Sequence, residues 1–285
     1  MQNIRSKIPH KIVNIVLLIL VLLSFSCNKE KVNIPSYISI DSTILNTNLQ
    51  VEGKNTKNIT DVWIYADDQF KGAFEIPCTI PLIKEGNTNI KIFAGIKDNG
   101  IAGTRVRYHF YKSFENNILL TKDSITNITP EFEYLNNAKF EIESFEGAGY
   151  NIDTTTNSEI NYSILQDINN NNYGSAILQN NLVFEISTQD FESLPQGGSP
   201  VYLEIDYRTN HNILAGAYIN YPFLVDNKEL LWITPKEDWN KIYINMTKTV
   251  SKALNNNSIK FYFRMYRTDT TEPSWFEFDN IKLIY

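Results

Sequence analysis

The chain has 285 residues, with 32 acidic and 26 basic side chains and a formal net charge of −6. This acidic balance argues against nucleic acids and anionic lipid headgroups as partners. Tyrosine and phenylalanine are plentiful, which favours strands over helices.

The first 26 residues have the pattern of a secretory signal. Basic residues precede an apolar run over residues 12–23, which is shorter than the roughly 20 apolar residues that a membrane-spanning helix needs. The stretch SFSC, which ends at Cys27, resembles a bacterial lipobox. This resemblance implies that the signal is cleaved before Cys27 and that the cysteine is acylated, as with palmitate. An ordinary cleaved signal peptide with an incidental cysteine is the alternative.

Residues 27–36 are expected to form a lipidated tether. Each buried methylene adds about 0.8 kcal/mol of membrane affinity, so several acyl chains would hold the protein on a membrane permanently. The residues that follow Cys27, KEK at positions 29–31, are similar to the charged tag of outer-membrane lipoproteins of Bacteroidetes. The resemblance implies a lipid-anchored protein of the outer membrane, and it favours the leaflet that faces the cell exterior.

Residues 37–113 are predicted to form a first domain of short strands with turns between them. Val62 and Ile64 alternate with Trp63 and Tyr65 up to an Asp-Asp turn, as in a hairpin. The stretch WIYADDQFKGAFEIPCTIPLIKEGNTNIKIFAG resembles the PEGA-type and small immunoglobulin-like modules of cell-envelope proteins. This resemblance implies a β-sandwich that serves as a non-catalytic spacer or docking domain.

Cys78 lies in this first domain, on an apolar strand between two prolines. With Cys27 lipidated, Cys78 has no partner for an intramolecular disulfide. A nucleophilic cysteine would need a nearby histidine, and His109 is the only one in this half of the mature chain. We therefore expect Cys78 to be a small buried hydrophobic residue.

A connector and a second domain are predicted to complete the chain. Residues 114–137 are irregular and contain Pro130 and an Asn-Asn pair, which predicts the connector. In residues 138–285, the order of FEIESFEG, SPVYLEIDYR, DWNKIYINMTKTVSKALNN, SIKFYFRMYR and SWFEFDNIKLIY resembles the jelly rolls of carbohydrate-binding modules and galactose-binding-like domains. The expected fold class is therefore all-β, with an immunoglobulin- or PEGA-like sandwich followed by a jelly-roll sandwich.

The last predicted strand contains a break in its pattern. Phe276 and Phe278 share one parity, whereas Ile281 and Leu283 share the other. A regular strand cannot bury all four residues, because successive side chains point to opposite faces. The pattern predicts a β-bulge near Asp279.

The jelly-roll resemblance also implies a structural calcium ion. In many such modules an acidic residue of the last strand and one of the first strand bind Ca²⁺ through oxygen atoms. Asp279 with Glu141 or Glu143 would supply the carboxylates here. The alternative is that Asp279 bonds local amide groups of the bulge.

A binding face is predicted on the polar sides of two strands, in SPVYLEIDYR and IKFYFRMYR, with Tyr218 of ILAGAYIN joined to it. Tyrosine rings with neighbouring charged groups suit sugars, and they equally suit a protein partner. A solvated sheet face with cross-strand ion pairs is the plain alternative. Trp232 and Trp275 are expected in the core or at its rim. The predicted face comprises Tyr202, Glu204, Asp206, Arg208, Tyr218, Tyr262, Arg264 and Tyr266.

The sequence does not contain a recognisable catalytic constellation. Zinc signatures, phosphate-binding glycine loops and nucleophile elbows are missing, and His109 and His211 fall in different predicted domains. We expect a non-catalytic envelope lipoprotein that is an accessory or scaffold subunit of an outer-membrane assembly. The alternative is a surface glycan-binding lipoprotein of a sugar-uptake system. A glycoside hydrolase, which needs two carboxylates at a set separation, comes third.

Overall fold

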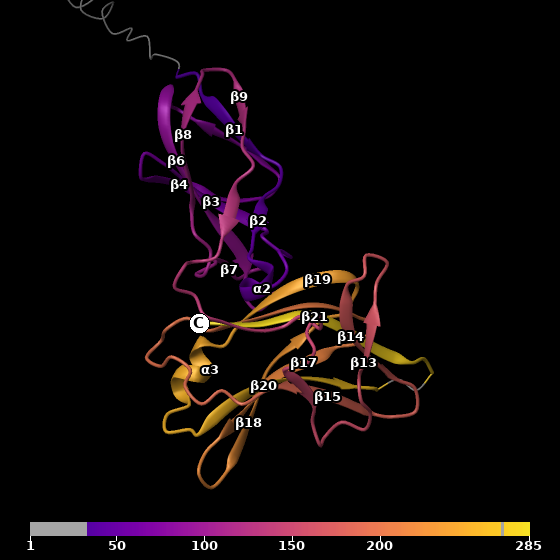
Figure 1. Ribbon diagram of the computed structural model, residues 1–285. Helices are drawn as coiled ribbons and strands as arrows, with labels where there is room; N and C mark the ends of the chain where they lie inside the picture. Colours follow the sequence, from indigo (N-terminus) through magenta and orange to yellow (C-terminus); the bar gives the residue numbers. More distant parts are fainter. Residues whose placement is uncertain (1–32, 269–270) are drawn as a thin grey trace, which may run out of the picture.

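The computed structural model describes residues 33–268 and 271–285, and these residues are almost entirely strands (Figure 1). The all-β fold class is confirmed. Two bodies follow each other along the chain, the first built from β1–β10 and the second from β11–β21. Within these residues, neither short helix has the length or the hydrophobicity of a membrane span. The signal and the lipidation site at Cys27 lie outside the described residues.

The first domain contains three small sheets with the orders β5-β1-β9, β10-β2 and β4-β3-β6-β7, and β8 also pairs with β6. The hairpin turn predicted at Asp67 and Asp68 is present, and both residues have positive φ angles, as type I′ turns require. Ile38, Ile64 and Ile92 contribute to a continuous apolar core. The elements are β1 (Ser36–Ile40), β2 (Ile44–Asn46), α2 (Leu49–Glu52), β3 (Asp61–Ala66), β4 (Gln69–Glu75), β5 (Cys78–Leu82), β6 (Gly86–Lys97), β7 (Arg105–Arg107), β8 (Phe114–Leu120), β9 (Ile125–Asn127) and β10 (Glu131–Glu133).

The segment predicted as a connector, residues 114–137, belongs to the first domain instead. It forms β8, β9 and β10, which pair with β6, β1 and β2. Phe132 and Tyr134 from this segment are buried in the core of the first domain. Two of the pairings are parallel and join strands far apart in sequence, so no local turn signal marks them.

The second domain is a sandwich of two sheets. We call the sheet β13-β14-β21-β16-β19, with β11 paired to β21, the junction sheet, and the sheet β12-β15-β20-β17-β18 the distal sheet. Ile205 of the junction sheet and Phe261 of the distal sheet belong to one core, as in a jelly-roll sandwich. The elements are β11 (Phe140–Glu143), β12 (Ile152–Thr154), β13 (Ser163–Gln166), β14 (Asn172–Leu178), β15 (Val183–Thr188), β16 (Tyr202–Thr209), β17 (Ile213–Asn220), β18 (Val225–Ile233), β19 (Lys236–Asn245), α3 (Thr247–Lys252), β20 (Ser258–Tyr266) and β21 (Ser274–Ile284).

The bulge predicted in the last strand is confirmed. Glu204 pairs with Lys282 and Asp206 with Asp279, so β21 advances three residues where β16 advances two. The extra residue allows Phe278 and Ile281 to enter the same core despite their opposite parity. Asn280 has a φ of 49°, in the left-handed region that asparagine tolerates.

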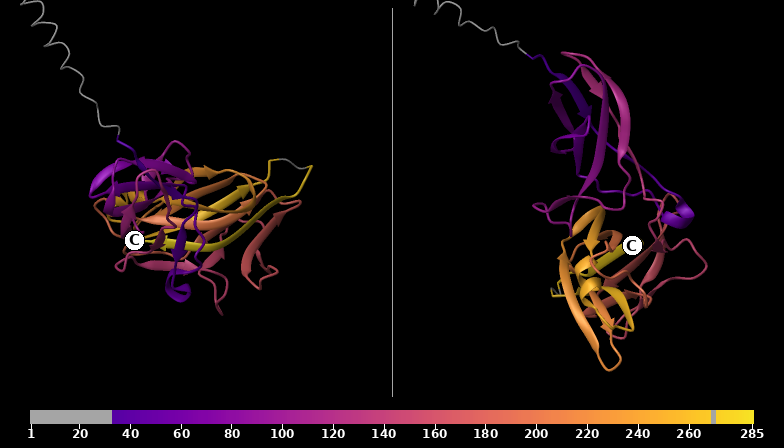
Figure 2. Two further views of the ribbon diagram at one scale, coloured as in Figure 1. Left: turned by 90° about the horizontal axis from the view of Figure 1, so that it is seen from above. Right: turned by 90° about the vertical axis from the view of Figure 1, so that its left-hand side faces the viewer.

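The first domain sits on the outer face of the junction sheet, while the distal sheet lies on the far side of the sandwich (Figures 1 and 2). The contact is polar and buried: Glu204 accepts hydrogen bonds from Tyr108 (2.6 Å) and Tyr134 (3.0 Å) and forms an ion pair with Lys241 (3.0 Å). Glu204 and Lys241 are almost completely buried. The two domains are therefore joined through a network that excludes water.

Candidate functional site

The eight residues of the predicted binding face do not form one surface, because β16 lies in a different sheet from β17 and β20. β16 belongs to the junction sheet, and the first domain covers its polar side. Tyr202 donates to Asp98 (2.9 Å) and Asp206 accepts from Thr56 (2.6 Å), so both contact the first domain. The expectation of one open face is corrected here: the alternation correctly placed these side chains outward, but another domain occupies that side.

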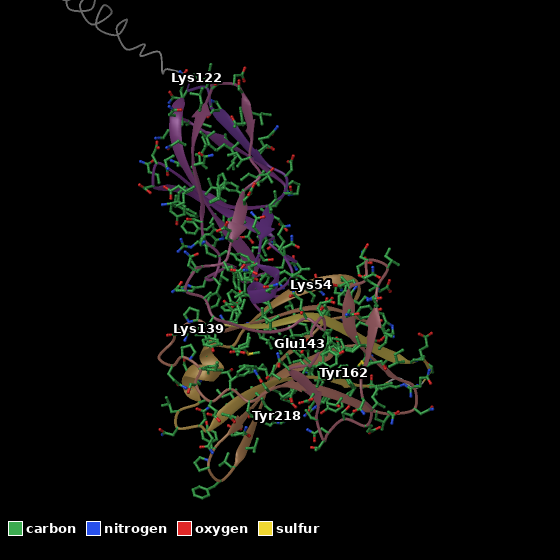
Figure 3. All side chains as sticks on the ribbon, in the orientation of Figure 1. Lys54, Lys122, Lys139, Glu143, Tyr162 and Tyr218 are labelled. Atoms are coloured by element: carbon green, nitrogen blue, oxygen red, sulfur yellow. The ribbon has the colours of Figure 1, made fainter. Side chains whose placement is uncertain are left out.

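The other half of the predicted face remains together on the outer side of the distal sheet. Arg264 donates hydrogen bonds to the hydroxyls of Tyr218 and Tyr266, both at 2.7 Å, and forms an ion pair with Glu185. The Tyr218 hydroxyl also donates to Glu185 (2.9 Å). Figure 3 places Tyr218 far from Lys54, which lies at the junction. Four residues from three strands thus make a fixed polar cluster.

Tyr262 lies beneath this cluster and is not an exposed platform for a ligand. Its ring lies over Gly216, where an added Cβ would come within 2.2 Å of ring carbon. The Tyr218 ring and the Arg264 guanidinium cover it at 4.7 and 4.9 Å, and Tyr262 is fully buried. Burial, with the neighbouring Glu185, raises the pKa of Tyr218 to about 12, so its hydroxyl keeps its proton near neutral pH.

Trp232 extends the same outward row of side chains. Cross-strand pairing joins one residue from each of four neighbouring strands. They are Glu185 of β15, Arg264 of β20, Leu214 of β17 and Trp232 of β18. The Trp232 side chain is 52% exposed, and its ring centroid lies 6.4 Å from that of Tyr266. The sequence predicts Trp232 in the core or at its rim and does not assign it to this face, because a single sequence does not show which strands are neighbours.

A cleft of about 800 Å³ opens beside this row. Its size is within the range of small-molecule sites, about 300–1,000 Å³. The Trp232 and Tyr266 rings provide apolar surface, and polar groups surround them. The other lining residues are Leu182, Val183, His211, Asn212, Arg267 and Thr268.

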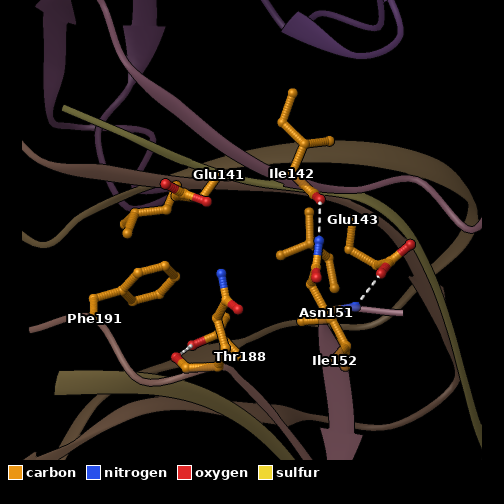
Figure 4. Close-up of a pocket in the computed structure, with 10 residues that line it drawn as sticks. Glu141, Ile142, Glu143, Asn151, Ile152, Thr188 and Phe191 are labelled. Carbon is orange, nitrogen blue, oxygen red and sulfur yellow. Dashed lines mark hydrogen bonds between the residues drawn. The ribbon is translucent and has the colours of Figure 1, made fainter. Parts of the chain in front are cut away.

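Two of the three residues predicted to bind calcium, Asp279 and Glu143, have protein partners in this structure. Asp279 forms an ion pair with Lys54 (2.7 Å) and accepts from the Asn280 backbone N–H (2.6 Å), as the alternative of a bulge cap predicts. Glu143 accepts from the backbone N–H groups of Phe145 and Asn151, and Glu141 lies on the other side of a crevice of only about 20 Å³ (Figure 4). Over residues 33–268 and 271–285, no three His, Cys, Asp or Glu side chains form a group suited to a metal. Calcium binding stays a prediction.

Cys78 is half-buried on β5, and burial raises the pKa of its thiol. A raised pKa disfavours the thiolate, which is the nucleophilic form. The raised pKa of its thiol thus does not favour Cys78 as a nucleophile.

Comparisons with known proteins find similarity in solved structures alone, since neither a family model nor a curated protein matches this chain. The CBM22-2 xylan-binding domain of Paenibacillus barcinonensis Xyn10C is 12% identical with a TM-score of 0.38, over 50% of this chain and 97% of that domain. A family 29 carbohydrate-binding module, CBM29-2, is 8% identical (TM-score 0.36, 53% and 93% covered). The family 11 module of Clostridium thermocellum Lic26A-Cel5E is 15% identical (TM-score 0.30, 52% and 88% covered). All three structures are carbohydrate-binding modules.

Proposed function

We propose that this chain is a non-catalytic glycan-binding protein of the bacterial cell envelope. The observation that carries the proposal is the cleft beside Trp232 and Tyr266, where two partly exposed rings meet a fixed polar cluster. Sugar rings pack their C–H faces on aromatic side chains, while their hydroxyls need donors and acceptors at set positions. The Tyr266 hydroxyl, held by its hydrogen bond from Arg264, lies in the cleft lining together with the polar side chains of His211, Asn212 and Thr268.

The position of the cleft fits a tethered protein. The described chain begins at Asn33 next to β1, at the end of the first domain that is farthest from the distal sheet (Figure 1). A lipid on Cys27 would therefore hold the distal sheet, whose strands β15, β18 and β20 contribute to the cleft, on the side of the body that is farther from the membrane. We propose an outer-membrane location with the body exposed to the cell exterior. Mass spectrometry of the mature N-terminus tests the anchor, and an unmodified N-terminus at another residue would contradict it.

Affinity electrophoresis tests glycan binding. The mature chain should migrate more slowly in gels that contain one of several neutral polysaccharides, among them xylan, mixed-linked β-glucan and starch. Trp232→Ala and Tyr266→Ala should weaken this retardation, because each removes a ring that lines the cleft. Phe223→Ala is the matched control, since Phe223 is 99% exposed in the β17–β18 hairpin but outside the cleft. Equal retardation of all variants would reject the cleft.

A second candidate function is docking to a protein of an outer-membrane assembly. The observation in its favour is an aromatic group on the outer face of the sheet β4-β3-β6-β7. Tyr65 packs against Phe70 and Phe93, and the Arg107 guanidinium lies 4.8 Å from the Phe93 ring and 5.9 Å from the Trp63 ring. Aromatic and arginine side chains are enriched at interface hot spots. A stoichiometric membrane partner recovered in mild detergent, and lost in Phe70→Ala, would favour this function.

Catalysis is the third candidate, and an activity assay separates it from binding. A glycosidase needs an acid and a second carboxylate facing one bond. We expect the purified chain to release no product from the glycans that it retains. Release of product would replace a binding function with an enzymatic one.

A further inference from the structure

A second cavity, of about 530 Å³, lies where the two domains meet. The first domain contributes the loop of residues 54–57. The second domain contributes the loop between β13 and β14 and the strands β16, β19 and β21. Clefts between domains are frequent ligand sites, because neither domain alone has to form a concave surface.

Trp239 is the aromatic wall of this cavity. It lies on β19, and its side chain is 39% exposed. The Tyr173 ring meets it edge-on at 5.4 Å and 82°, and the Arg208 guanidinium lies 5.2 Å from its ring centroid. Arg208 is in turn held by an ion pair with Glu277. The indole is therefore fixed in one orientation by groups that leave part of it accessible.

The charges around the cavity balance. Two of the three lysines are paired: Lys54 with Asp279 at 2.7 Å, and Lys241 with Asp206 at 3.3 Å. Lys57 is the third lysine and Asp167 the third aspartate, so the formal charge of the lining sums to zero. A ligand without net charge suits a lining whose formal charges sum to zero. The charged residues are Lys54, Lys57, Lys241, Asp167, Asp206 and Asp279.

Polar groups that can bond hydroxyls also line the cavity. Asp167 uses one carboxylate oxygen to accept from the backbone N–H groups of Asn169 (2.8 Å) and Asn171 (2.9 Å), which fixes the loop. Asn55 and Asn169 present exposed amide side chains. A partly exposed indole, amides and a carboxylate, with no net charge, are the combination that a neutral sugar ring needs.

We infer that this junction cavity is a second saccharide-binding site, centred on Trp239 and separate from the cleft at Trp232. The inference rests on the proposed function and extends it, because two sites on one chain would let it hold a long or branched glycan at two points. Binding at two points raises the overall affinity through effective concentration, without any new contact.

The indole N–H signals of the four tryptophans in two-dimensional NMR separate the two sites. The mature chain in mild detergent is titrated with cellohexaose, xylohexaose and maltohexaose, and each signal is assigned by Trp→Phe substitution. We expect the Trp239 signal to shift saturably with at least one probe, and to do so also in Trp232→Ala. Trp63 and Trp275, which line neither cavity, should not move.

Asp167→Asn sharpens the test. Asparagine keeps an oxygen for the two backbone N–H groups but replaces the other carboxylate oxygen with a donor. Loss of a hydrogen bond to a charged group should weaken binding at Trp239 about tenfold or more, and binding at Trp232 should not change.

A Trp239 signal that stays still while Trp232 shifts overturns this inference and leaves the proposed function intact. A shift of Trp239 alone supports the inference and rejects the distal cleft, and silence of both signals with all three probes contradicts both sites.

Discussion

The Tyr108 hydroxyl of the first domain donates a 2.6 Å hydrogen bond to the Glu204 carboxylate of the second. Burial alone would raise the pKa of Glu204, but the charges of Lys241 and Lys282 hold it below its usual value. The carboxylate therefore stays ionised at the centre of the junction. This arrangement means that the first domain is a fixed part of the molecule and not a loosely hinged spacer.

Glu204→Ala should destabilise the protein by about 3–5 kcal/mol, because it leaves Lys241 buried without its closest carboxylate. Denaturant unfolding measures the change. Glu133→Ala is the control, since the Lys112–Glu133 pair is exposed and should contribute little. Equal unfolding midpoints for the two variants would show that the junction network does not stabilise the fold.

Stability should rise between pH 7 and pH 9. Burial, followed by the charge of Lys241, lowers the pKa of Lys282 to about 7. Above this pH the folded protein has released a proton that the unfolded chain keeps up to a pKa of about 10.4, so the free energy of unfolding increases with pH. The slope is at most about 1.4 kcal/mol per pH unit. Denaturant unfolding at both pH values measures it, and Lys282→Met should remove this rise. If Lys282→Met keeps the same slope, a group other than Lys282 causes the pH dependence.

Gly216→Ala should disturb the candidate site through the Tyr262 ring, which lies over Gly216. The new methyl group would lie 2.2 Å from the Tyr262 ring, so Tyr262 must move against Tyr218 and Arg264. We expect a loss of about 1–3 kcal/mol in stability, as in overpacked cores, together with weaker glycan retardation. Gly103→Ala is the control, because no atom lies within 4 Å of its added Cβ. Full retardation in Gly216→Ala would indicate that the Tyr262 cluster does not shape the site.

The bulge at Asn280 should be sensitive to the shape of its side chain. Asn280 donates to Thr56 (2.8 Å) and Asp206 (2.9 Å) while its φ angle is positive. Both Asn280→Val and Asn280→Gly lose these two hydrogen bonds, but only valine places a β-branched side chain where φ is positive. Asn280→Val should therefore cost more stability than Asn280→Gly, by about 1–3 kcal/mol. Thermal unfolding of the two variants gives the order. The reverse order would mean that the left-handed backbone is not a constraint there.

Local patterns in the sequence predicted much of the fold. Alternation placed Tyr202, Glu204 and Asp206 on one side of a strand, and the parity of Phe278 and Ile281 required the bulge. What covers a face could not be predicted in this way. Tyr108 and Glu204 are 96 residues apart, and no local pattern marks their contact.

The candidate site was predicted only in part, because it too depends on contacts between residues that are far apart in the sequence. Tyr218, Tyr262, Arg264 and Tyr266 were placed on one face, and the structure brings them together. The burial of Tyr262 depends on Gly216 of the neighbouring strand, and the position of Trp232 depends on the order of strands in the sheet. Strand order follows from long-range packing, which a single sequence does not reveal.

The central claim is that the cleft beside Trp232 and Tyr266 binds a glycan. Titration calorimetry with an oligosaccharide of the retained polysaccharide tests it most directly, on the natural chain and on Trp232→Ala. We predict at least a tenfold weaker affinity for the variant, because truncation of an aromatic hot-spot residue costs about 2 kcal/mol or more. The same affinity in both proteins, at equal thermal stability, would contradict the claim.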